Sequence, residues 1–144
     1  MATVRLTPAS LVAVVWLAPW AGVPSPAMAQ SAPITFIVPF ERDSVDIGEA
    51  QRRVIVEAVT RFRRNCRRCT QIEVTGHASP AEGGGAAVAL SHTRAEEVVA
   101  ELLIEGLTTG QLEIRAYGAG IPVVASPRND QEDARNRRVV LQLR

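Results

Sequence analysis

Lysine is absent from the 144-residue chain, so all sixteen basic side chains are arginines. Fifteen aspartates and glutamates oppose them, and the formal net charge at pH 7 is only +1. A nucleic-acid-binding domain is expected to carry a clear excess of positive charge. The composition therefore predicts no nucleic-acid partner. Any anion that the chain binds will meet the flat, bidentate guanidinium of an arginine rather than the point charge of a lysine.

Aromatic side chains are also scarce. After residue 30 the chain contains only Phe36, Phe40, Phe62 and Tyr117. A hydrophobic core must therefore be built mainly from valine, leucine, isoleucine and alanine. An aromatic platform on which bases or sugar rings stack is not expected.

No hydrophobic run reaches the roughly 20 residues that a membrane-spanning helix needs. The apolar run Leu11–Trp20 is interrupted by a proline, follows the basic residue Arg5 and precedes Ala-Met-Ala at residues 27–29. This order is typical of a secretory signal peptide with cleavage after Ala29. We predict a signal peptide at residues 1–29, and a short N-terminal membrane anchor is the alternative. No cysteine stands at the cleavage point, so we expect no lipid anchor there.

Removal of such a signal leaves 115 residues, Gln30–Arg144. That length suffices for one domain with one modest core. The remaining chain has lost one arginine, so fifteen arginines oppose fifteen acidic residues and the formal charge is zero. We expect a short leader at residues 30–35, a domain at residues 36–144 and no membrane span after the signal.

Cysteine occurs twice, at Cys66 and Cys69. A thioredoxin-like redox pair needs this spacing just after a strand and at the start of a helix, whereas here the pair follows a predicted helix. A zinc site that adds His77 and His92 has suitable atoms but poor spacing. In an exported protein a structural disulfide is favoured, and we predict a Cys66–Cys69 bond and no metal.

Hydrophobic periodicity predicts the order β-α-β-α-β-β. Alternating or β-rich segments indicate strands at Ile34–Phe40, Gln71–Thr75, Gln111–Tyr117 and Asn136–Leu143. Apolar stripes at helical spacing indicate helices at Glu49–Arg64 and from Ser91, or earlier, to Glu105. Residues 118–135 are predicted to form a long polar loop. The economical arrangement is an α/β (α+β) two-layer sandwich, with two helices packed on one face of a small mixed sheet.

Four short motifs follow one another along these elements: Val74-Thr75-Gly76-His77, Leu90-Ser91-x-x-Arg94-Ala95, Gly118-x-Gly120 and Asn136-Arg137-Arg138-Val139. In this order and spacing they resemble the OmpA-like C-terminal domain, which also occurs in the peptidoglycan-associated lipoprotein and in flagellar stator subunits. The resemblance covers the chain from about Phe36 to Leu143 and implies the fold already predicted.

The resemblance also implies non-covalent binding of peptidoglycan. In the family, an aspartate after Gly-His-Thr and the arginine of Leu-Ser-x-x-Arg-Ala hold the ammonium and the carboxylate of diaminopimelate in the stem peptide. Charge-assisted, bidentate pairs supply both energy and orientation for such a ligand. Here Arg94 keeps the position of the family's arginine, whereas Ser79 replaces the aspartate and Ala87 replaces the loop asparagine. The carboxylate-binding half of the site is kept and the ammonium-binding half is not.

Glu82 lies three residues after Ser79 in the same loop, and we consider it a substitute for the missing aspartate. Loss of a charged hydrogen bond costs about 1.5–3 kcal/mol, so weakened or altered wall binding is expected. The resemblance adds Asn136 and Arg138 to the predicted pocket. Solvated charges on an edge strand are an equally strong interpretation of Arg138, and Arg94 is an ordinary helical residue if its helix begins near Ala86.

These features predict a non-catalytic periplasmic domain that binds peptidoglycan, with other envelope proteins as further partners. The alternative is a protein-interaction module of an envelope assembly that no longer binds the wall. Neither paired carboxylates at a persuasive site nor a nucleophile with its base is found, so no enzyme activity or cofactor is expected. Five arginines between Arg61 and Arg68 form either a solvated helix end or a contact for an anionic partner.

Overall fold

The computed structural model describes residues 33–65, 69–83 and 85–144. The predicted signal peptide (residues 1–29), half of the predicted leader (residues 30–32) and Cys66 lie outside these ranges, so the signal and the Cys66–Cys69 disulfide stay predictions. The chain divides into two units, and the second, Ser31–Arg144, contains all the described elements. Within the described part of the chain, no helix is both long enough and apolar enough to cross a membrane.

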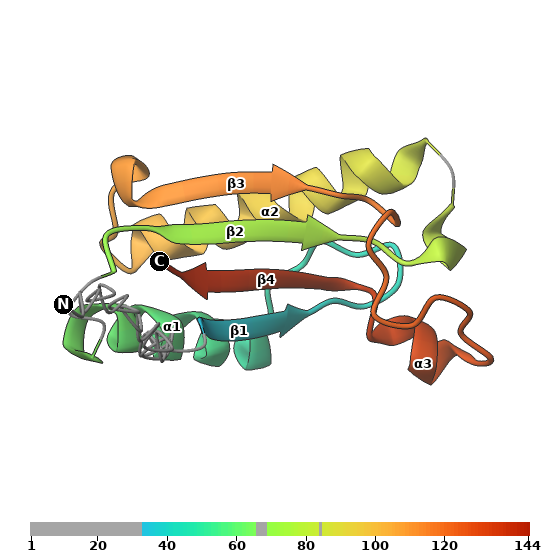
Figure 1. The fold of residues 1–144 in the computed structure, drawn as a ribbon, viewed down its shortest axis with the longest axis horizontal. Coiled ribbons are helices and arrows are strands. Elements are labelled where there is room, and N and C mark those ends of the chain that lie inside the picture. Colours follow the sequence, from blue (N-terminus) through green and yellow to red (C-terminus); the bar gives the residue numbers. More distant parts are fainter. Residues whose placement is uncertain (1–32, 66–68, 84) are drawn as a thin grey trace, which may run out of the picture. The chain divides into compact units, whose positions relative to one another are not determined.

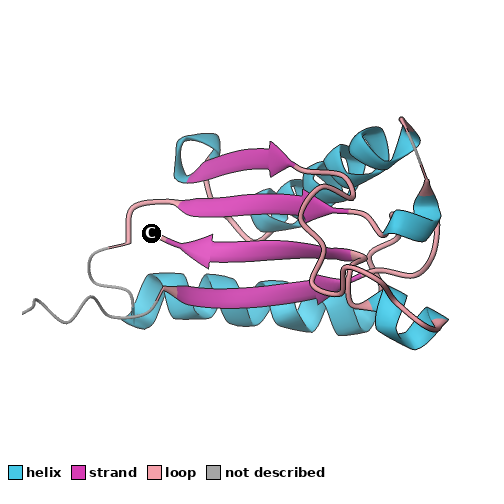
Figure 2. Cartoon of the chain, turned by 45° about the vertical axis from the view of Figure 1, so that its right-hand side comes forward, coloured by secondary structure: helices cyan, strands magenta, loops and turns pink. Residues whose placement is uncertain are grey.

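Four strands form one mixed sheet in the order β1-β4-β2-β3. The strands are β1 (Ile34–Pro39), β2 (Ile72–His77), β3 (Leu112–Ala116) and β4 (Arg138–Leu143). The central strand β4 is antiparallel to both β1 and β2, and β2 is parallel to β3. Helices α1 (Glu49–Asn65) and α2 (Ala86–Ile104) both lie on one face of the sheet (Figures 1 and 2). The predicted two-layer fold is confirmed.

The alternation of side chains along the strands explains why the helices cover only one face. Val38, Val74 and Leu141 point to the same side of neighbouring strands, and all three are fully buried in the core. Ile37 points to the other side, which neither α1 nor α2 covers, and is 56% exposed. We call this second side the open face of the sheet.

Gly76 allows α2 to lie unusually close to β2. A Cβ atom at this position would stand 1.9 Å from the carbonyl oxygen of Ser91, which belongs to the helix backbone. The hydroxyl of Ser91 accepts a hydrogen bond from the backbone N–H of Gly118, at 2.9 Å. The glycine and serine of the first two motifs therefore fix the helix against the end of the sheet that carries the loops.

Helix α2 begins at Ala86, the earlier of the two starts that the sequence left open, so Arg94 is not in its first turn. The structure differs from the sequence prediction in one element. A short helix, α3 (Asp130–Ala134), stands within the predicted polar loop. Its N-cap residue Asn129 accepts a hydrogen bond from the backbone N–H of Glu132, at 2.8 Å. A single turn is too short to show helical periodicity, and only this capping pattern signalled it.

A candidate site around a buried arginine

Arg94 is fully buried, and its guanidinium group is saturated by four residues from three segments of the chain. Nε donates to the carbonyl oxygen of Ser44 at 2.8 Å, and Nη2 donates to that of Glu41 at 2.9 Å. The two terminal nitrogens also bind the carboxylate of Glu82 bidentately, at 2.9 and 2.5 Å. Nη1 makes a longer contact of 3.4 Å with the carbonyl oxygen of His77. All five N–H donors of an arginine are thereby used.

Glu82 is held as firmly as its partner. It ends a 3₁₀ turn (Pro80–Glu82) and points back beneath its own loop. Its two carboxylate oxygens also accept hydrogen bonds from the backbone N–H groups of Ser79, at 2.8 Å, and Asp43, at 2.9 Å. Burial alone would raise the pKa of Glu82, but the hydrogen bonds from Arg94, Ser79 and Asp43 outweigh it and lower that pKa. The carboxyl group of Glu82 is therefore ionised at neutral pH.

The loop between β1 and α1 completes the site. Phe40 follows β1, and its ring lies 5.3 Å from the guanidinium carbon of Arg94. The carbonyl oxygens of Glu41 and Ser44 come from the same loop, as does the N–H of Asp43 that binds Glu82. This loop was not part of the predicted site, since nothing in its sequence distinguishes a carbonyl that binds an arginine.

Ser79, at the position of the family's aspartate, is also fully buried. Its hydroxyl oxygen has no hydrogen-bond partner among the residues that the structure describes. Within the turn at residues 78–83, Glu82 is the only acidic residue. That turn therefore presents no free anion that would receive an ammonium group.

The remaining predicted site residues lie elsewhere. Asn136 fastens a loop: its side-chain oxygen accepts from the N–H groups of Val123 and Val124, at 2.8 and 3.0 Å, and its amide donates to the carbonyl of Val124. Arg138 lies in register with His77 of β2 and Pro39 of β1, on the open face of the sheet. The structure thus joins Arg94, Ser79 and Glu82 in one cluster and places the side chain of Arg138 on the opposite face of the sheet.

Arg137 has a structural environment of its own. Its Nη1 lies 3.0 Å from a carboxylate oxygen of Asp133 and 3.1 Å from one of Asp130. Its Nε makes a contact of 3.4 Å with the carbonyl oxygen of Phe40. Arg137 therefore ties α3 to the loop that surrounds Arg94.

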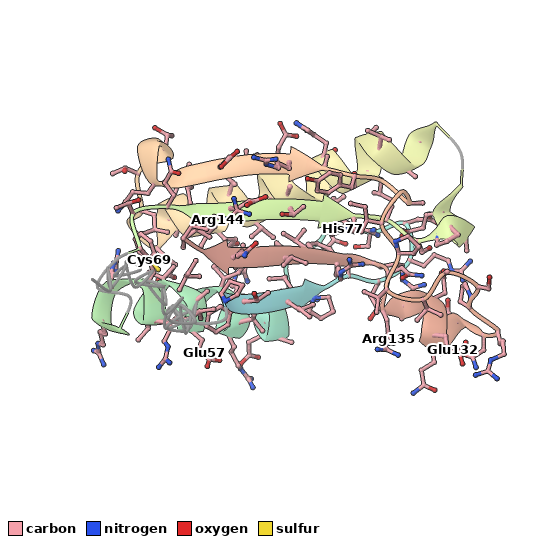
Figure 3. The ribbon with its side chains drawn as sticks, viewed as in Figure 1. Glu57, Cys69, His77, Glu132, Arg135 and Arg144 are labelled. Atoms are coloured by element: carbon pink, nitrogen blue, oxygen red, sulfur yellow. The ribbon has the colours of Figure 1, made fainter. Side chains whose placement is uncertain are left out.

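His77 ends β2, where Figure 3 shows it among the side chains of the sheet. Its ring stacks on that of Tyr117, with centroids 5.7 Å apart, and its buried Nδ1 has no hydrogen-bond partner in the described part of the chain. Burial, with a smaller contribution from the charge of Arg138, lowers the pKa of His77 from 6.5 to about 4.

This lowered pKa predicts a pH-dependent stability. Between pH 6.5 and about 4, the unfolded chain binds a proton at His77 that the folded chain does not. The free energy of unfolding should therefore fall as the pH falls through this range, by up to about 1.4 kcal/mol per pH unit. We expect His77→Phe to flatten the dependence in urea titrations at several pH values. His92→Gln, at an exposed histidine, is the control and should keep the full slope; an equal slope in both variants contradicts the assignment.

Comparisons with known proteins agree with this fold. The model of the OmpA family matches residues 39–137. An outer membrane protein of Gluconacetobacter diazotrophicus is 34% identical over 112 aligned residues, and the match covers 73% of this chain and 29% of the relative. The chain thus spans less than a third of the length of that relative.

Solved structures of low sequence identity share the fold. The peptidoglycan-associated lipoprotein from Burkholderia pseudomallei superposes with a TM-score of 0.67 at 23% identity, covering 76% of this chain and 90% of its own. The C-terminal domain of Helicobacter pylori MotB gives a TM-score of 0.63 at 21% identity, covering 72% and 81%. The family model covers well over half of the chain and contains three of the four motifs completely, with the fourth beginning at its end. This chain therefore belongs to the OmpA family.

Proposed function

We propose that this chain is a non-catalytic OmpA-like domain of the periplasm, in which Glu82 fills the receptor that the family uses for the diaminopimelate carboxylate. The wild-type protein then binds the stem peptide only weakly, because Glu82 already occupies Arg94. The names of its relatives support the setting, since one is a peptidoglycan-associated lipoprotein and another an outer membrane protein. The predicted signal peptide agrees with export.

The observation that carries this proposal is the bidentate pair between Arg94 and Glu82. A ligand carboxylate must displace Glu82 to reach the guanidinium group. The exchange replaces one charge-assisted pair by another of the same kind. Glu82 competes from within the chain, and tethering gives such a group an effective concentration in the millimolar range or above. Free diaminopimelate at lower concentration therefore has little advantage over the internal carboxylate.

The other end of the ligand also lacks its partner. Ser79 carries no charge and its side chain is buried. Glu82, the only acidic residue of the same turn, is already paired with Arg94. An ammonium group that loses a charged hydrogen bond forfeits about 1.5–3 kcal/mol, or roughly one to two powers of ten in affinity. Both halves of the site therefore favour weak binding.

Sedimentation with isolated peptidoglycan sacculi tests the proposal. We expect little wild-type protein in the pellet, and that amount should not fall when excess free meso-diaminopimelate is added. Glu82→Ala opens the receptor and should increase the pelleted fraction, in a manner that free diaminopimelate reverses. Glu97→Ala, at an exposed position of α2, the helix that carries Arg94, is the matched control. Strong wild-type binding that diaminopimelate abolishes would overturn the proposal.

The closed receptor also favours a second function, that of a protein-interaction module in an envelope assembly. Such a module keeps the OmpA-like fold and needs no access to Arg94. If neither the wild type nor folded Glu82→Ala sediments with sacculi, this second function becomes the better account.

A further inference from the structure

A groove of about 380 Å³ lies on the open face of the sheet, away from the buried Arg94. Its apolar lining comes from Ile37 and Pro39 of β1, Val123 of the loop between β3 and α3, and Ala134 of α3. Ile37 and Val123 are 56% and 48% exposed, so the groove is open to solvent. This volume is at the lower end of the roughly 300–1,000 Å³ typical of ligand pockets.

Three arginines, Arg135, Arg137 and Arg138, complete the lining. Arg137 is neutralised by Asp133. Arg135, which Figure 3 places beside α3, is exposed and has no ion pair among the described residues. The groove therefore combines an apolar floor with an excess of positive charge, and none of the described residues that line it is acidic.

Arg138 is the unusual member of this set. Only 7% of it is exposed, yet no carboxylate lies within ion-pair distance of it in the described part of the chain. Its guanidinium group makes two long contacts of 3.3 Å, with the carbonyl oxygens of Asn136 and Ile121. Its desolvation is strong enough to lower its pKa. The other two buried arginines, Arg94 and Arg137, each hold a carboxylate.

A buried cation without a counter-ion is costly, and proteins usually pair it. Arg138 is the one buried arginine of the described residues that lacks a carboxylate partner, and it lines an open, apolar groove. The missing partner therefore matches a ligand that carries a carboxylate next to an aliphatic group. A carboxylate fits the planar guanidinium bidentately, and the aliphatic group would cover Ile37 and Val123.

We propose that this groove binds the C-terminal end of a partner polypeptide, with the terminal carboxylate on Arg138 and an aliphatic last side chain on the floor formed by Ile37, Pro39 and Val123. The size of the groove favours a chain end over a long acyl chain, because ligand pockets bury most of the surface of what they bind. An open groove of this volume covers one or two residues. The groove is also separate from Arg94 and Glu82, so its test does not depend on the filled receptor.

Titration with short peptides, followed by NMR chemical shifts, tests this site in the purified protein. The probe is N-acetyl-Ala-Ala-Leu with a free carboxylate, and its C-terminal amide is the matched control ligand. We expect saturable binding of the free acid and roughly ten- to a hundred-fold weaker binding of the amide. Shifts should be largest at Ile37, Val123 and Arg138.

Two variants separate the carboxylate contact from the apolar contact. Arg138→Met should reduce the affinity for the free acid to that for the amide, and the exposed Ile37→Ser should weaken both ligands. Arg64→Met, at an exposed arginine of α1, should change neither. Equal affinity for acid and amide in the wild type would overturn the proposal, as would unchanged binding to Ile37→Ser. Tighter binding of octanoate than of the peptide would overturn the assignment to a chain end.

Discussion

Replacement of Arg94 by methionine is expected to lower the free energy of unfolding by about 3–5 kcal/mol, the usual cost of breaking a buried ion pair from one side. The substitution removes the donors to three backbone carbonyls and leaves the carboxylate of Glu82 buried with only two N–H partners. Urea unfolding of the wild type and the variant at neutral pH measures the difference. A domain of this size has only about 5–15 kcal/mol of stability, so the variant should be marginally folded.

The double variant Arg94→Met with Glu82→Leu distinguishes the ion pair from mere side-chain volume. Replacing both partners by apolar groups removes the unpaired charge and is often neutral or stabilising. We therefore expect the double variant to recover much of the loss, with the two single effects strongly non-additive. Arg64→Met, on the exposed side of α1, should change stability by no more than about 0.5 kcal/mol. A loss of stability below about 1 kcal/mol in Arg94→Met would show that the buried ion pair with Glu82 does not stabilise the fold as proposed.

Glu82→Ala is expected to create a site for small carboxylates. The substitution leaves the guanidinium of Arg94 and the N–H groups of Ser79 and Asp43 directed at a carboxylate-shaped space. Acetate or formate should enter it and restore stability. A ligand that binds only the folded state stabilises it by about 2.7 kcal/mol at a concentration of 100 times Kd. Thermal unfolding of the variant at increasing acetate concentration measures this rescue.

Chloride at matched ionic strength controls for screening, and Glu97→Ala controls for the loss of a carboxylate elsewhere on the protein. We expect a rise in Tm with acetate for Glu82→Ala alone. If acetate acts equally on the wild type and the variant, the space left by Glu82 is not a carboxylate receptor.

The fold could be predicted because its signals are local and repeated. The alternation in β2 and the helical stripe of α1 each place several apolar residues on one side, and burial of these sides leaves few arrangements. Helix α3 was not predicted, because a single helical turn is too short to show hydrophobic periodicity. The start of α2 stayed open in the prediction, because the glycines before Ala86 weaken any prediction of a helix boundary.

The site was harder to predict because it depends on contacts between distant segments. Arg94 and Glu82 were both singled out, but their pairing requires the 3₁₀ turn after Ser79 to fold back towards the helix. The three backbone carbonyls around Arg94 carry no sequence signal at all. Alternation along the chain puts Arg137 and Arg138 on opposite sides of the sheet, and the burial of Val139 on the core side places Arg138 on the open face. Arg137 and Arg138 therefore belong to the same sequence motif but to different sites on the protein.

The central claim, that Glu82 occupies the carboxylate receptor of Arg94, is tested most directly by following the Nε–H resonance of Arg94 during titration with meso-diaminopimelate. We predict that this resonance does not move in the wild type and shifts saturably in Glu82→Ala, at a ligand concentration where Glu97→Ala shows no change. A saturable shift in the wild type, with an affinity equal to that of Glu82→Ala, would contradict the account. In that case the receptor would be open to the wall while Glu82 is present.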